Sequence, residues 1–127
     1  MQTILLVEDS KLLRISTERA MMKAGYCVIS ACDGDEALQV AANSLPDLIV
    51  LDMLLPKRSG PDVLRALKED LRTADIPVVV SSGIYEKNAD KLIQQGACAF
   101  VEKNALLDDA DPLLQTIKTA LQGSRSQ

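Results

Sequence analysis

The sequence predicts an α/β fold in which a doubly wound, five-stranded parallel sheet is covered by five helices. Short apolar runs of strand length alternate along the chain with longer segments whose apolar residues recur at helical spacing. Because crossovers between parallel strands are right-handed, this alternation places helices on both faces of the sheet. With 127 residues, of which 47% are hydrophobic, the chain has the size and composition of one domain with a substantial core.

The run 47–56 is the most informative of the five predicted strands. Its four consecutive apolar residues, 48–51, end directly in Asp52. An unbroken apolar run of this length is typical of a strand that is buried on both faces. The run 26–31 has a more mixed polarity, so we expect it at an edge of the sheet. The other strands are expected at 3–7, 76–80 and 98–101.

Five amphipathic segments are expected to form the helices. Pro61 follows Ser59 and Gly60, and proline at the first helical position is a strong start signal. Apolar residues continue at helical spacing from there through Leu71. The other helices are expected at 11–24, from 33 to before Pro46, at about 86–95 and at 111–121. The domain is expected to span residues 1–122, followed by a polar tail at 123–127.

Composition excludes several classes of function. No apolar run approaches the roughly 20 residues that span a bilayer, and the amino terminus lacks the layout of a signal peptide. The net charge of −4 disfavours direct binding of nucleic acid. The chain has no histidine and no Cys-x-x-Cys pair, which argues against a zinc site. We expect a cytoplasmic protein in which Cys27, Cys32 and Cys98 are small buried hydrophobic residues in a reducing compartment.

Polar residues follow four of the predicted strands. Glu8 and Asp9 follow the first, Asp52 ends the third, Ser82 follows the fourth and Lys103 follows the fifth. In a parallel sheet these ends share one edge, where ligands bind in open α/β folds. Two unit charges about 4 Å apart repel by roughly 4 kcal/mol at an effective dielectric near 20, so three clustered carboxylates favour a cation. Oxygen ligands suit Mg2+ or Mn2+, beside which an aspartate could attack phosphorus and form an aspartyl phosphate.

With these motifs in register, the chain resembles the response-regulator receiver domain from its first strand to its last helix. The family pattern has an acidic pair after the first strand and a phospho-accepting aspartate after the third. It has serine or threonine after the fourth strand and lysine after the fifth, and all these positions match. The resemblance implies a flavodoxin-like strand order of 2-1-3-4-5. It also implies a stand-alone switch of a two-component phosphorelay, phosphorylated in a magnesium-dependent reaction by a sensor histidine kinase or a histidine phosphotransfer protein.

The resemblance further implies a role for each matched residue. Phosphorylation would bias the face formed by the fourth helix, the fifth strand and the fifth helix toward a downstream protein partner, in a monomer or a phosphorylation-dependent dimer. Phe100 stands where the family has an aromatic switch residue. Asp52 would be the phosphoacceptor. Asp9 would bind the metal directly, Glu8 would bind it through water, and the backbone carbonyl of Leu54 would be a further ligand. Lys103, Ser82 and the amide of Gly83 would bind the phosphoryl group.

Other interpretations apply to single residues. Phe100 could serve core packing alone, Lys103 could be a solvated surface lysine, and Ser82 could be a helix cap. Asn104 stands where the family usually has a proline with a cis bond. A cis bond before a non-proline residue costs roughly 2.5–4 kcal/mol, so the bond before Asn104 is either trans or a strained cis bond. The two forms would orient Lys103 differently.

Three other functional classes are weaker. An aspartyl-phosphate phosphohydrolase of the haloacid-dehalogenase type needs an acid two residues after its nucleophile, where this chain has Leu54. A flavodoxin-type cofactor binder needs a phosphate-binding loop after the first strand, where Glu8 and Asp9 would repel phosphate. A degenerate receiver that only binds partners is disfavoured because every reactive position is present. We therefore expect self-phosphorylation and autodephosphorylation, and no other enzymatic activity.

Overall fold

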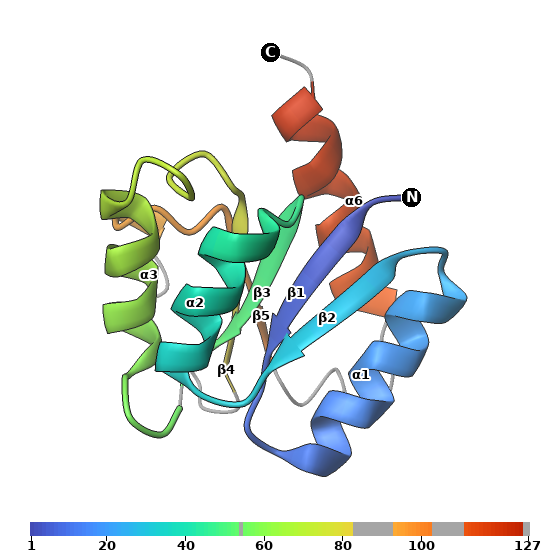
Figure 1. Cartoon of the computed structure of the whole chain (residues 1–127). Coiled ribbons are helices and arrows are strands. Elements are labelled where there is room, and N and C mark those ends of the chain that lie inside the picture. Colours follow the sequence, from blue (N-terminus) through green and yellow to red (C-terminus); the bar gives the residue numbers. More distant parts are fainter. Residues whose placement is uncertain (54, 83–92, 103–110, 126–127) are drawn as a thin grey trace.

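A parallel sheet of five strands forms the centre of the molecule (Figure 1). The computed structural model describes residues 1–53, 55–82, 93–102 and 111–125. The strand order β2-β1-β3-β4-β5 confirms the doubly wound fold, and β2 lies at an edge as its mixed polarity predicts. All neighbouring strands are parallel. The strands are β1 (Thr3–Val7), β2 (Cys27–Ala31), β3 (Leu48–Asp52), β4 (Val78–Ser82) and β5 (Ala99–Glu102).

Four of the expected helices lie within the described residues, and the expected helix at 86–95 falls largely outside them. Three of the four begin at a polar cap. The Ser10 hydroxyl, the Asp33 carboxylate and the Ser59 hydroxyl each accept a hydrogen bond from the backbone amide three residues further on. The helix α6 continues through the polar residues after Leu121. The helices are α1 (Lys11–Lys23), α2 (Gly34–Ser44), α3 (Gly60–Glu69) and α6 (Asp111–Arg125).

The sheet separates two hydrophobic cores, and the alternation of side chains along β3 supplies both. Ile49 and Leu51 pack with the apolar faces of α2 and α3, while Leu48 and Val50 pack with those of α1 and α6. All five residues of β3 are buried. This confirms that β3 is buried on both faces, and its carboxyl end is therefore a rigid support for Asp52.

One expectation drawn from an apolar residue was wrong. Leu71 does not extend α3: the helix ends at Glu69, Asp70 has extended backbone angles, and Leu71 is 94% exposed. The Asp70 carboxylate accepts a hydrogen bond from the Arg72 amide at 2.9 Å, which stabilises the turn there. In α1, Leu12 is 76% exposed, so the buried face of that helix is narrower than the apolar pattern suggests.

The cysteines are the second correction. Cys27, Cys32 and Cys98 are all exposed, not buried as expected. The strand order gives the reason, because β2 and β5 are the two edge strands of the sheet. Cys27 opens β2, Cys32 follows its last residue, and Cys98 precedes β5.

None of the helices in the described part of the chain has the length and apolarity that crossing a membrane would require.

Candidate functional site

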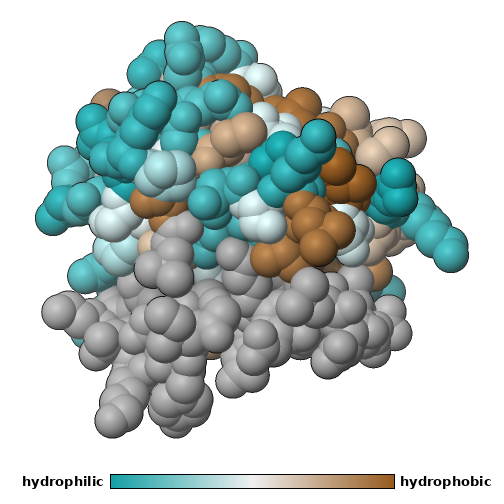
Figure 2. Space-filling view, turned by 90° about the horizontal axis from the view of Figure 1, so that it is seen from below, coloured by the Kyte–Doolittle hydropathy of each residue, from teal (hydrophilic) through white to brown (hydrophobic). Residues whose placement is uncertain are grey.

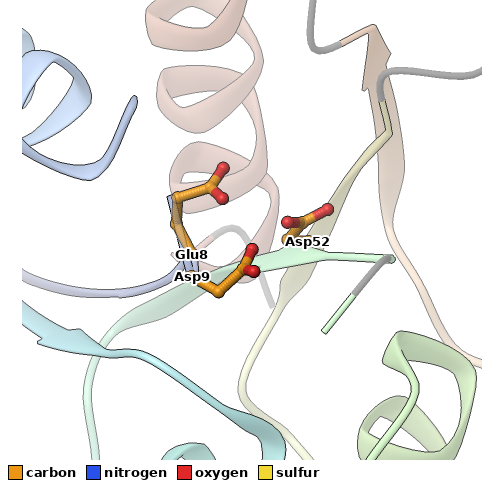
Figure 3. A group of neighbouring side chains, drawn as sticks. All are labelled: Glu8, Asp9 and Asp52. Carbon is orange, nitrogen blue, oxygen red and sulfur yellow. The ribbon is translucent and has the colours of Figure 1, made fainter. Parts of the chain in front are cut away.

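Three carboxylates meet where β1 and β3 leave the sheet. The two strands are parallel neighbours with Val7 opposite Leu51, so the residues that follow Val7 emerge beside Asp52. One carboxylate oxygen from each of Glu8, Asp9 and Asp52 lies within 4.8 Å of the other two (Figure 3). The structure thus brings together the three acids that the sequence places at this edge.

The three acids differ in their exposure to solvent. Glu8 is 3% exposed and Asp52 is 1% exposed, whereas Asp9 is exposed. The Glu8 carboxylate accepts a hydrogen bond from the Ser10 amide at 3.1 Å. The backbone at Glu8 is fixed by the sheet, since its amide donates a hydrogen bond to the Ala31 carbonyl. Two buried carboxylates are therefore held in place, and the third faces solvent, from which a cation can enter.

Arg14 fixes the turn that carries the acidic pair. Its guanidinium donates a hydrogen bond to the Glu8 carbonyl at 3.1 Å and lies 4.0 Å from the Glu18 carboxylate. Glu18 in turn accepts a hydrogen bond from the Ser30 hydroxyl on β2. This chain of contacts ties α1 and β2 to the backbone of Glu8. No pattern in the sequence indicates this role of Arg14, because its contacts depend on how α1 packs beside the turn.

The backbone after Asp52 is closed by a contact that only glycine permits. The Gly60 amide donates a hydrogen bond to the Met53 carbonyl at 3.1 Å. A Cβ atom on Gly60 would lie 2.5 Å from the Met53 Cα and 2.7 Å from the Asp52 carbonyl oxygen. The start of α3 therefore packs directly against the end of β3.

Apart from Leu54, the other residues of the predicted site lie on β4 and β5 or follow them in the chain. Ser82 is the last residue of β4 and is in register with Glu102, while Ser81 lies opposite Asp52. Phe100 lies opposite Val80 in β5, half-buried against the core that includes α2 and α3. Leu54, Gly83, Lys103 and Asn104 lie outside the described residues.

The acids fit a hard divalent cation. Among the described residues, they are the one group of three or more potential metal-binding side chains close enough to share an ion. All three donors are carboxylate oxygens, the ligands that magnesium prefers. Two oxygens on one magnesium ion are at most about 4.2 Å apart, twice the usual bond length. Three oxygens within 4.8 Å of one another are therefore close to the spacing that one magnesium ion requires.

The surface around this end of the molecule is mixed in character. Figure 2 views it from below, where hydrophilic and hydrophobic residues lie side by side on the described part. Leu12, the second residue of α1, is exposed three positions after Asp9.

Comparisons with known proteins agree with this geometry. Residues 4–118 match the family model for the response regulator receiver domain. The polar-differentiation response regulator DivK of Brucella anthropi is 34% identical over 122 residues, which cover 94% of this chain and 96% of DivK. Histidine kinase P4 of Formosa agariphila is 36% identical over 105 residues, which cover 80% of this chain. The match spans only 7% of that kinase.

Solved structures share both the fold and the strand arrangement. The signal receiver domain of a Vibrio parahaemolyticus protein named as a Luxo repressor is 31% identical, with a TM-score of 0.88 over 98% of this chain and 92% of that domain. Chemotaxis protein CheY4 of Vibrio cholerae is 25% identical, with a TM-score of 0.86 over 94% of this chain and 98% of CheY4. The chain belongs to the response regulator receiver domains, the phosphoacceptor signalling domains of two-component systems.

Proposed function

We propose that Asp52 is the phosphoacceptor of this receiver domain. The observation that carries the proposal is the burial of Asp52 at the end of β3, with oxygens of Glu8 and Asp9 within 4.8 Å. Asp52 is the carboxylate of the three that ends a strand buried on both faces, so its position is the most rigid. A rigid nucleophile needs little reorganisation to reach the geometry of attack.

The transfer would proceed as an in-line displacement. A carboxylate oxygen of Asp52 attacks the phosphorus of a phosphohistidine on a histidine kinase or phosphotransfer protein. The new O–P bond forms as the N–P bond breaks, and the bonding electrons pass to the imidazole nitrogen. The product is an acyl phosphate on Asp52, and its additional negative charge beside Glu8 and Asp9 needs compensation.

A magnesium ion, or manganese, would supply that compensation by neutralising charge on the phosphoryl oxygens. Asp9 and Asp52 would bind it directly and Glu8 through water, with the backbone carbonyl of Leu54 as a further ligand. The Lys103 ammonium, the Ser82 hydroxyl and the Gly83 amide would hold phosphoryl oxygens. The support for these roles is the matching family pattern, together with the adjacency of β3, β4 and β5 in the sheet.

The output would be a change in protein binding. Phosphorylation would draw Ser82 toward Asp52, and Phe100 would move inward on β5. The equilibrium would then shift between two states of the face formed by the segment before β5, by β5 and by α6. A downstream protein that binds one state better would read the signal, with the domain acting as a monomer or a phosphorylation-dependent dimer. This cycle would take place in the cytoplasm.

The experiment is an intact-mass measurement after incubation with magnesium and a small acyl phosphate donor. Wild type should gain the mass of one phosphoryl group, and the gain should disappear with Asp52→Asn or with a chelator. Asp62→Asn is the matched control, because Asp62 is an exposed aspartate on α3. It should be phosphorylated like wild type. A gain of mass that persists in Asp52→Asn would show that the acceptor lies elsewhere.

A further inference from the structure

A strained turn lies between the acceptor strand and α3. The Arg58 amide donates a hydrogen bond to the Pro56 carbonyl at 2.8 Å, two residues back. Lys57, the residue between them, has a φ of 68°. A three-residue turn with a positive φ at its centre is rare and strained for any residue other than glycine. Such a conformation persists only where the surrounding structure holds it.

Two ion pairs to the start of α2 hold this turn. The Lys57 ammonium lies 3.5 Å from Oδ2 of Asp33, and Nε of Arg58 donates to Oδ1 of Asp35 at 2.7 Å. Asp33 is itself fixed, because its Oδ1 caps α2 by accepting the Glu36 amide at 2.9 Å. That hydrogen bond, followed by the charge of Lys57, lowers the pKa of Asp33, so the carboxylate stays charged.

The backbone of the turn also touches α2 directly. A Cβ atom on Gly34 would lie 3.1 Å from the Arg58 carbonyl oxygen and 2.8 Å from a methyl group of Val63. Glycine at the first position of α2 therefore lets the turn approach the helix closely. At its other end, the same segment is closed by the hydrogen bond from Gly60 to Met53. The segment is thus held on one side by α2 and on the other by the end of β3.

We propose that Lys57 and Arg58 are positioning residues, whose ion pairs with Asp33 and Asp35 hold the segment after Asp52 in the conformation that binds the metal. The inference rests on the proposed function. The segment follows Asp52 directly, and Asp52 is a proposed ligand of the metal. Lys57 is five positions after Asp52, and the hydrogen bond from the Gly60 amide to the Met53 carbonyl holds the two ends of this loop together.

The sign of the effect separates this role from simple electrostatics. Arg58 carries a positive charge in the loop that follows Asp52, so removing it should strengthen the binding of a cation if only long-range charge matters. If Arg58 instead positions the loop, its removal should weaken binding. Exposed ion pairs contribute modestly, so the expected change in Kd is about two- to five-fold.

The test is isothermal titration of the full chain with magnesium chloride. The variants are Arg58→Asp, Asp35→Arg and the double variant that exchanges the two charges. Each single variant should bind magnesium about two- to five-fold more weakly, and the exchanged pair should recover most of the loss. Arg65→Gln is the matched control, since the 2.7 Å ion pair of Arg65 with Asp62 lies within α3. It should bind like wild type.

The outcomes separate the two proposals. If wild type binds no magnesium, the metal site of the proposed function fails, and this inference fails with it. If wild type binds magnesium and Arg58→Asp binds as tightly or more tightly, the positioning role is wrong while the proposed function stands. If both single variants bind weakly and the exchanged pair does not recover, the loss is not caused by the ion pair, and the positioning role is again overturned.

Discussion

Replacing Asp9 with asparagine should stabilise the metal-free protein. The Asp9 carboxylate has an oxygen within 4.8 Å of oxygens of Glu8 and Asp52, so the substitution removes two repulsive charge pairs with little change in shape. A pair at 4.8 Å repels by about 3.5 kcal/mol at an effective dielectric of 20 and by about 0.9 kcal/mol in bulk water. Because Asp9 is exposed, the lower value is the relevant one, and two pairs give about 2 kcal/mol.

The assay is thermal unfolding in a chelator and in excess magnesium. For a domain of this length, 1 kcal/mol shifts the Tm by about 4 °C, so Asp9→Asn should melt about 8 °C above wild type in the chelator. Magnesium should raise the Tm of wild type, since a ligand bound only to the native state stabilises it. The same magnesium concentration should leave the Tm of Asp9→Asn nearly unchanged.

The matched control is Asp75→Asn. Asp75 is an exposed aspartate in the segment before β4, so it lies at the opposite edge of the sheet from the acids. Its replacement should change the Tm little and leave the magnesium effect intact. The reasoning would be refuted if Asp9→Asn melted at or below the temperature of wild type in the chelator, or if magnesium stabilised both proteins equally.

Three further predictions concern stability and reactivity. Gly60→Ala should lower the free energy of unfolding in urea by about 1–3 kcal/mol, because its Cβ would overlap the backbone at the end of β3. Gly123→Ala, whose Cβ meets nothing within 4 Å, should not lower it; an equal loss in both would contradict the packing argument. The pKa of Asp33 is lowered, chiefly by the amide that it caps, so its carboxylate should stabilise the fold above its usual pKa of 3.8 and lose that contribution as the pH falls through the lowered value. Asp33→Asn should therefore flatten the acid limb of the stability curve measured by circular dichroism, and an unchanged limb would argue against this role. Although the Cys98 side chain is exposed, neighbouring atoms partly desolvate its thiol and raise its pKa. With the other two cysteines replaced by serine, alkylation at pH 8.5 should therefore be slower in the folded protein than in urea, and equal rates would refute the shift.

The sheet could be predicted well from the sequence because its central strands are buried on both faces. Alternate residues of β3 face opposite sides of the sheet, and both sides are buried, so every position before Asp52 is apolar. The result is a continuous apolar run that ends at Asp52. The order of the strands came from the family resemblance, since an apolar run does not encode its neighbours. For the same reason, the exposure of the cysteines was predicted wrongly. It follows from the edge positions of β2 and β5, which the apolar runs do not reveal.

Helix ends were less predictable where apolar residues continue past the last turn. Leu71 fits the spacing of α3, but the backbone turns at Asp70, whose carboxylate accepts the Arg72 amide. Leu12 likewise fits a helical stripe, yet α1 does not turn it toward the core. A spacing pattern gives a face of the helix and says nothing about how much of that face the sheet covers.

The acids of the site could be predicted because each follows a strand, and parallel strands end at one edge. Arg14, Lys57 and Arg58 could not be predicted in this way. Their roles depend on contacts between the turn after β1, the loop after β3 and the helices beside them. A positive φ at a lysine leaves no sequence signal, because the residue type usually marks such positions only when it is glycine or asparagine.

The central claim is that Asp52 carries the phosphoryl group, and locating that group tests it most directly. The phosphorylated chain is treated with borohydride, which reduces an acyl phosphate on aspartate to homoserine, and its peptides are then sequenced by mass spectrometry. The account predicts homoserine at position 52 only, and only after incubation with magnesium and the phosphodonor. Homoserine at position 9, 5-hydroxynorvaline (the reduction product of a glutamyl phosphate) at position 8, or neither product in a protein that has gained phosphoryl mass, would contradict it.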